Sequence, residues 1–161
     1  MEEKNLINQD SYFSGDTPKE IIESTITEIS KILAEFYPEH LSYGDGSYTI
    51  SRGSTQVMIV VRPFTEKEAC VECIATVVSE PEVSFDLMRF LLRKNSELHF
   101  GAFGLLFDDT ITFTYSFSSG ALSSNELRIA LESVAIISDY YDDIIVDIAG
   151  GKRAKDMGSE L

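Results

Sequence analysis

The sequence predicts an α+β fold in which helices pack on one twisted antiparallel sheet. Apolar residues recur at helical spacing in three segments and alternate at strand spacing in five, which gives the order α-β-β-β-α-β-β-α. The 161 residues are 43% apolar and 25% charged, which is the composition of a globular protein. A chain of this length buries roughly 70% of the surface that its unfolded form exposes. We therefore expect one domain with one core.

The first predicted helix begins at a capping box. Thr17, Pro18 and Glu20 stand at the N-cap, N1 and N3 positions. An apolar stripe with spacings of three and four residues follows and ends before Pro38, which cannot continue a helix. The stripe consists of Ile22, Ile26, Ile29, Leu33 and Phe36.

Three segments rich in β-branched residues follow Pro38 and predict a meander of strands. They cover residues 47–52, 55–62 and 70–79. The Arg-Gly-Ser sequence at 52–54 is typical of a tight turn between the first two strands. We expect these strands to pair in chain order.

A second helix is predicted over residues 85–98, with Ser84 as its N-cap. Four of its polar residues, Asp86, Arg89, Arg93 and Glu97, fall in one arc of roughly 80°, and apolar residues cover much of the remaining circumference. Such a helix needs a covering layer, which either its own chain or another subunit supplies. Six side chains form the candidate dimer or partner interface: Phe85, Leu87, Met88, Phe90, Leu91 and Leu92.

Residues 101–117 predict a hairpin with apolar residues alternating along both strands. A two-residue loop would place the two apolar rows on opposite faces of the sheet, whereas the three-residue loop 108–110 places them on one face. We therefore expect the longer loop. The expected pairs are Phe107 with Ile111, Leu105 with Phe113, and Phe103 with Tyr115.

The last helix begins at a second capping box, formed by Ser123 and Glu126. It is expected to extend to about Ile148, because Gly150 and Gly151 follow. The predicted organisation is a flexible N-terminal arm, a single α+β domain and a flexible C-terminal tail: residues 1–15, 16–150 and 151–161.

The net charge of −14 limits the classes of partner. Because Lys and Arg supply most of the affinity for phosphate backbones, we expect binding to neither nucleic acid nor anionic membranes. Residues 41–100 carry −2, whereas the region on each side carries −6. No basic leader precedes an apolar segment, and no apolar run approaches the ~20 residues that span a bilayer. We expect a cytoplasmic protein that uses its charge for solubility; the alternative is that the charge steers a basic partner.

The two cysteines, Cys70 and Cys73, have the spacing of a redox or zinc motif. Redox motifs usually open a helix, whose dipole lowers the pKa of the thiol, whereas this segment has the pattern of a strand. Three-residue spacing on a strand directs the two thiols to opposite faces, and a structural zinc site needs four ligands. We expect incidental cysteines and no cofactor.

Candidate catalytic and metal-binding groups are few. The two histidines, His40 and His99, are expected at the surface or at a helix end. No nucleophile or phosphate-binding motif is present, so we do not expect an enzyme. An acidic cluster on the last helix is interpreted as a solvated face rather than a metal site. The cluster comprises Asp139, Asp142, Asp143 and Asp147.

The segment LLRKNSELHFGAFGL, residues 91–105, is followed by a hairpin and a long acidic helix, and resembles the YbjN-type proteins. These are described as bacterial sensory transduction regulators, and the resemblance is sharpest over residues 85–148. It implies the fold of type III secretion chaperones and no catalytic residue. It also implies a small acidic homodimer that holds partner protein segments in extended form on apolar grooves.

We therefore expect a non-enzymatic, dimeric protein-binding or regulatory module with a chaperone-like action and an unknown protein partner. The alternative is a small-molecule-binding sensory regulator. Native mass spectrometry, which detects a retained ligand, and pull-down of an unstructured partner distinguish the two hypotheses.

Overall fold

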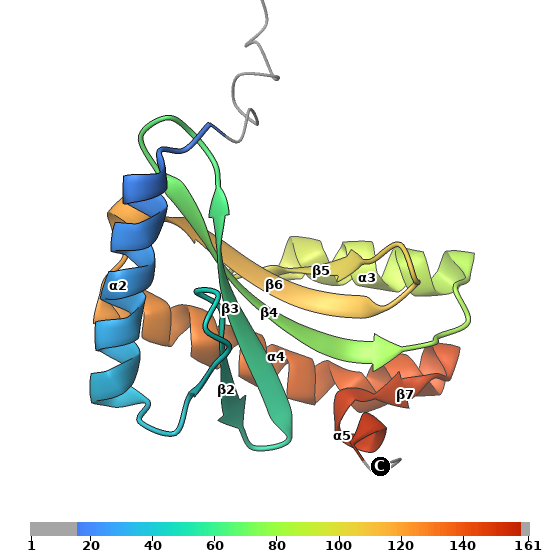
Figure 1. The fold of residues 1–161 in the computed structure, drawn as a ribbon. Coiled ribbons are helices and arrows are strands. Elements are labelled where there is room, and N and C mark those ends of the chain that lie inside the picture. Colours follow the sequence, from blue (N-terminus) through green and yellow to red (C-terminus); the bar gives the residue numbers. More distant parts are fainter. Residues whose placement is uncertain (1–15, 159–161) are drawn as a thin grey trace, which may run out of the picture.

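The computed structural model describes residues 16–158, so the arm expected over residues 1–15 lies outside them. Among the described residues, a seven-stranded antiparallel sheet has the order β1-β2-β3-β4-β6-β5, and β7 pairs with β4 (Figure 1). The α+β class and the order of the main elements are as predicted. The strands are β1 Leu41–Ser42, β2 Tyr48–Arg52, β3 Thr55–Pro63, β4 Ala69–Ser79, β5 Ala102–Leu105, β6 Ile111–Ser118 and β7 Lys152–Arg153.

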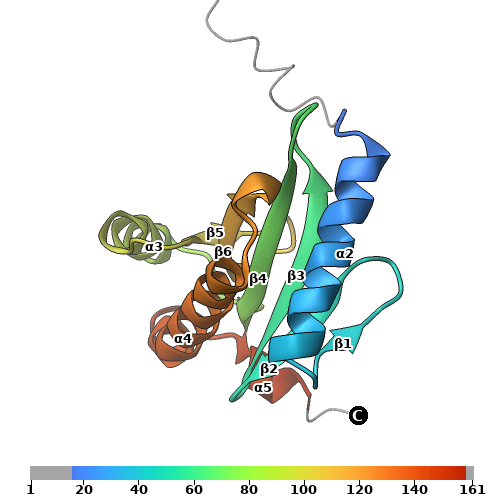
Figure 2. The same ribbon diagram turned by 90° about the vertical axis from the view of Figure 1, so that its left-hand side faces the viewer.

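Two long helices cover one face of the sheet, and a third lies at its edge (Figure 2). α2, Lys19–Phe36, packs on β3 and β4, whereas α4, Ser124–Ala149, packs on β3, β4 and β6. α3, Phe85–Glu97, lies beside β5 and also contacts α4. The short helices η1, Ser119–Ala121, and α5, Ala154–Met157, flank α4 in the sequence. Among the strands, α3 therefore packs mainly against β5 at the edge of the sheet.

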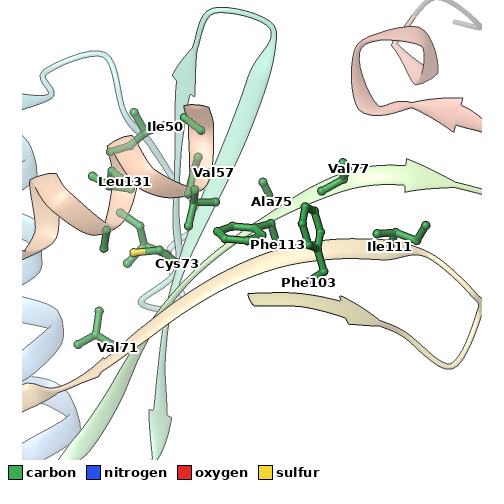
Figure 3. Close-up of a cluster of buried hydrophobic side chains, with 14 of the residues drawn as sticks. Ile50, Val57, Val71, Cys73, Ala75, Val77, Phe103, Ile111, Phe113 and Leu131 are labelled. Atoms are coloured by element: carbon green, nitrogen blue, oxygen red, sulfur yellow. The ribbon is translucent and has the colours of Figure 1, made fainter. Parts of the chain in front are cut away.

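The core lies between the sheet and the two long helices. Alternate residues of β4 point into it, and Val71, Cys73, Ala75 and Val77 are buried, as the two-residue period of a strand requires. Phe113 of β6 is completely buried beside Ala75 (Figure 3). Because each buried large apolar side chain contributes about 1.5–3 kcal/mol, this layer holds the helices against the sheet.

The start of α2 differs from the predicted capping box. The N-cap residue is Pro18, and no side chain caps the helix. The Oγ1 of Thr17 donates to the carbonyl oxygen of Thr65 at 2.7 Å and accepts from the N–H of Phe64 at 2.7 Å. These bonds occupy the hydroxyl group, so it joins α2 to the β3–β4 connection instead of capping the helix.

The other helix termini are as predicted. Ser84 Oγ accepts from the N–H of Leu87 at 3.1 Å at the start of α3. Ser123 Oγ accepts from the N–H of Glu126 at 3.0 Å at the start of α4. The C-cap of α4 is Gly150, whose φ of 65° lies in the left-handed region that favours glycine.

The β5–β6 hairpin has the predicted faces but not the predicted register. Its loop spans residues 106–110 instead of 108–110, and the N–H of Leu106 donates to the carbonyl of Thr110 at 2.9 Å. A shift of two residues keeps every side chain on its face, so apolar alternation alone does not separate the two registers. The observed pairs are Phe103 with Phe113 and Leu105 with Ile111.

The segment expected as a flexible tail contains regular structure between residues 152 and 157. The two residues of β7 pair with Val78 and Ser79 of β4, and α5 follows directly. Gly151 has a φ of 89°, and a Cβ atom at this position would lie 2.6 Å from the carbonyl oxygen of Ser79. The close approach of β7 to β4 therefore requires glycine here.

Candidate functional site

The outer side of α3 carries exposed apolar side chains. Phe85, Met88 and Leu92 are spaced by three and four residues, which places them on one side of the helix. Their exposed fractions are 69%, 45% and 70%. We call these three residues the α3 ridge. A group of neighbouring exposed apolar side chains is typical of an interaction surface.

The remaining predicted interface residues point toward the chain's own core. Leu87 is 0% exposed and Leu91 is 7% exposed. Phe90 is partly buried, and its ring meets that of Tyr141 edge to face, with 6.2 Å between the centroids. The structure therefore divides the six candidates into three that stabilise the fold and three that form the α3 ridge.

Asn95 fixes α3 to the edge of the sheet. Its Nδ2 donates to the carbonyl oxygen of Phe103 at 3.1 Å, and its Oδ1 accepts from the N–H of Phe103 at 2.7 Å. The side-chain amide thus takes the place of a neighbouring strand for one residue of β5. An extended peptide can add to β5 at this residue only by displacing Asn95.

Gly101 allows the chain to turn from α3 into β5. Its φ is 89°, and a Cβ atom here would lie 2.6 Å from the ring of Phe113 and 2.8 Å from the carbonyl oxygen of Thr114. Asn95 and Gly101 thus have structural roles at two positions of the segment over residues 91–105. A hollow of about 580 Å³ lies beside this turn and is lined by His99, Phe100, Gly101, Ala102, Phe103, Gly104, Thr114, Tyr115 and Ser116.

A second exposed apolar region lies at the tip of the β5–β6 hairpin. Phe107 is completely exposed, and Leu106 is 42% exposed. Leu106 also borders a hollow of about 330 Å³ on the face of the sheet that faces away from α2 and α4. This region was not predicted, because the apolar alternation along the sequence placed Phe107 in a strand. The hollow is lined by Tyr43, Thr49, Gln56, Met58, Ile74, Thr76, Leu106, Thr112 and Ala154.

The two cysteines lie on opposite faces of β4, as the spacing predicted. Cys73 is buried and Cys70 is partly buried, and both are free thiols. Burial raises the pKa of Cys73 to about 12 and also raises the pKa of Cys70. A raised pKa is the opposite of the thiolate stabilisation that a redox motif needs.

The acidic cluster of α4 is not the uniformly solvated face that the sequence predicted. Asp142 is buried, and its Oδ2 lies 3.4 Å from the Nζ of Lys155. Asp143 is exposed and pairs with Arg153. The expectation was wrong for Asp142 because the C-terminal segment folds back over it. Within residues 16–158, His, Cys, Asp and Glu form no group of three that could hold a metal ion.

The histidines have different surroundings. The Nδ1 of His40 lies 2.7 Å from the carbonyl oxygen of Tyr37, and its ring meets that of Tyr48 edge to face. His99 is exposed after the end of α3. The positions of both agree with the predicted surface or helix-end location.

The arrangement of helices and strands is similar to that of a chain in the crystal structure of the ExsC–ExsE complex. The TM-score is 0.61 at 13% sequence identity, over 78% of this chain and 96% of that chain. The class is therefore an α+β fold of the type III secretion chaperone kind. The chain belongs to the family described as "T3SS (YopN, CesT) and YbjN peptide-binding chaperone 1", whose model matches residues 19–157. No curated protein matches the chain.

Membership of this family confirms the resemblance to the YbjN-type proteins. It indicates a peptide-binding, chaperone-like module and points to a non-enzymatic, protein-binding role. Within residues 16–158, every helix is too short or too polar to cross a membrane.

Proposed function

We propose that the chain is a cytoplasmic homodimer that holds extended segments of a partner protein, and that two copies meet through the α3 ridge. The observation that carries this proposal is the exposure of three large apolar side chains on α3 in a peptide-binding chaperone family. Burying such side chains stabilises a contact by about 1.5–3 kcal/mol each before the costs of association.

The position of α3 supports a contact between two copies. The helix lies at the rim of the molecule beside the edge strand β5 (Figure 2). Arg89 lies over the ring of Phe85 at 4.6 Å, so the ridge has a polar border. Interfaces commonly combine an apolar centre with a polar border of this kind.

The partner segment is expected to bind chiefly by side-chain burial. At β5, Asn95 already occupies the outward backbone groups of Phe103. The hollows beside β5 and on the open sheet face offer apolar walls for anchoring side chains. Native mass spectrometry of the purified protein tests the small-molecule alternative, because a retained ligand would add its mass to the chain.

The dimer is tested by sedimentation of Leu92→Asp at micromolar concentration. The wild-type chain is expected to sediment as a dimer and Leu92→Asp as a folded monomer, because a carboxylate cannot be buried without a partner. Leu91→Asp is unsuitable for this test because Leu91 is buried in its own chain. Ile136→Asp is the matched control.

Ile136 lies on α4 and is 63% exposed, close to the exposure of Leu92. It borders a different hollow, beside Arg52, Gly53 and Ser54. The control variant is expected to remain dimeric. A wild-type monomer would refute the dimer, and equal dissociation of both variants would refute the placement of the contact on the α3 ridge.

A further inference from the structure

The two strands beside β4 do not cover the same part of it. β6 pairs with β4 as far as Val78, but β3 pairs with β4 only as far as Ile74. Beyond Ile74, the pairing on the β3 side comes from the two residues of β7, opposite Val78 and Ser79. The far end of β4 therefore forms a strand-pairing slot that a C-terminal segment of the same chain occupies.

The slot has acidic side chains along its border, and its occupant is basic. Arg153 pairs with Asp143, and Lys155 Nζ lies 3.4 Å from Asp142 Oδ2. Lys152 Nζ lies 3.6 Å from the carboxylate of Glu80. We use the term β4 slot for residues 75–79 of β4 together with Glu80, Asp142 and Asp143.

The fit between the β4 slot and its occupant is incomplete at Asp142. The side chain of this residue is only 9% exposed. Its Oδ1 is buried and has no hydrogen-bond partner within residues 16–158, and the same holds for Ser138 Oγ one turn earlier on α4. A buried carboxylate oxygen without a partner is costly. An arginine guanidinium can donate to both oxygens of one carboxylate, whereas the ammonium of Lys155 is a point charge.

We propose that residues 152–157 act as an internal pseudoligand, and that the β4 slot binds a basic segment of the partner protein that pairs with the end of β4 and then turns into a short helix, as residues 152–157 do, with arginines two positions apart. This inference rests on the proposed peptide-binding function and specifies the chemistry of the peptide. The partner arginines correspond in position to Arg153 and Lys155. The second arginine completes the hydrogen bonding of Asp142.

The energetics allow exchange between the internal segment and a partner. The ion pairs of Lys152 with Glu80 and of Arg153 with Asp143 join partly exposed side chains and contribute about 0–1 kcal/mol each, and β7 adds only two paired residues. Because residues 152–157 are covalently attached to the chain, their effective concentration at the β4 slot is on the order of millimolar. A free peptide of the same sequence therefore competes poorly. Removing the basic side chains of residues 152–157 should therefore make the β4 slot accessible to peptides added in solution.

The test measures binding of a capped peptide with the sequence of residues 151–158 to full-length proteins, by fluorescence anisotropy. The double variant Arg153→Ser/Lys155→Ser is expected to bind the peptide at least tenfold more tightly than wild type. Lys19→Ser/Lys31→Ser is the matched control, because it removes the same charge from exposed ion pairs on α2. The control is expected to bind no better than wild type.

Two further measurements test the role of Asp142. The peptide carrying Lys155→Arg is expected to bind the double variant more tightly than the original peptide. Adding Asp142→Asn to the double variant should remove most of this binding, with circular dichroism showing that the variant remains folded. Equal affinity of wild type and double variant, or binding unaffected by Asp142→Asn, would overturn the proposal. Neither result depends on the oligomeric state, which sedimentation tests separately.

Discussion

The side chain of Asn95 makes the two hydrogen bonds to β5 that a neighbouring strand would make at Phe103. Its amide offers one donor and one acceptor at the spacing that the backbone of Phe103 requires. Asn95 lies in the segment over residues 91–105 that carries the family resemblance, but the sequence does not indicate its partner. The pairing depends on how α3 lies against β5, which no local pattern specifies.

The contribution of Asn95 is measured with Asn95→Ala. We expect a loss of about 1–3 kcal/mol in the free energy of unfolding, because the N–H and C=O of Phe103 lose their partners in a part-buried position. Urea denaturation gives the value. Ser96→Ala removes an exposed hydroxyl that bonds within α3 and is expected to change stability by less than about 0.5 kcal/mol. Similar losses in both variants would contradict the role of Asn95.

Cys73 is expected to make the free energy of unfolding depend on pH above about pH 9. Its pKa is raised by burial from 9.0 to about 12, so the folded protein holds the thiol neutral. The stabilising contribution is complete below pH 9 and is lost as pH rises toward 12. We expect the urea midpoint to fall between pH 9 and 11, and to fall less in Cys73→Ala. Parallel pH profiles for the two proteins would contradict this assignment.

Helix caps were predictable where the cap is a local interaction. Ser84 and Ser123 each bond to an N–H three residues later, and both were identified from sequence. Thr17 occupies an equivalent position in the sequence, but its hydroxyl bonds to the connection between β3 and β4. Whether such a hydroxyl group caps the helix thus depends on partners that are distant in sequence, which the neighbouring residues do not indicate.

At the scale of elements, the hairpin register illustrates the same limit. The alternation of apolar residues along β5 and β6 correctly predicts which side chains share a face. The register is set by the loop over residues 106–110, in which Asp109 has a φ of 63°. Because Phe107 is apolar, the sequence pattern extended β5 by two residues too many. Phe107 is completely exposed, so the apolar alternation wrongly included a side chain that belongs to the loop.

The turn between α3 and β5 is tested by Gly101→Ala with Gly44→Ala as its control. Both glycines have a left-handed φ, 89° and 79°, but a Cβ atom at Gly44 meets no atom within 4 Å. The strain of the backbone alone costs about 1–2 kcal/mol, so we expect that loss for Gly44→Ala. Gly101→Ala should lose about 1–3 kcal/mol more, because its Cβ meets the ring of Phe113. Equal shifts in thermal unfolding would contradict the contact.

The α3 helix was predictable in outline but not in detail. Its excess of apolar side chains indicated a surface that needs covering, and the exposed α3 ridge is such a surface. The sequence did not show which of the six residues belong to the core, because that depends on the side of α3 that faces Tyr141 and β5. Leu91 and Leu92 are neighbours in sequence, yet one is buried and the other exposed.

For the whole molecule, the net charge of −14 offsets the exposed apolar surface. The pI is about 4.4, so lowering the pH from 8 toward this value removes the repulsion between molecules. We expect light scattering to rise steeply as the pH approaches 4.4. The rise should be smaller for Phe107→Ser, which removes a completely exposed apolar side chain. Equal scattering of both proteins would show that Phe107 does not contribute to association.

The fold of the whole chain was predictable because the helical and strand spacings of apolar residues recur many times along the sequence. The helical and strand periods gave the α+β class, and the resemblance over residues 85–148 gave the chaperone fold. The C-terminal segment was not predictable, because six residues carry no period of their own. Its structure follows from the glycines at 150 and 151 and from the charges that α4 presents to it.

The position of β4 at the centre of the sheet has a consequence for native-state fluctuations. β4 pairs with β3, β6 and β7, so its amides are released only when several elements separate together. Hydrogen–deuterium exchange of residues 70–76 is therefore expected to require global unfolding. The amides of β7 should exchange much faster, through local opening that leaves the sheet intact. Persistent and transient backbone hydrogen bonds are therefore expected a few residues apart along β4.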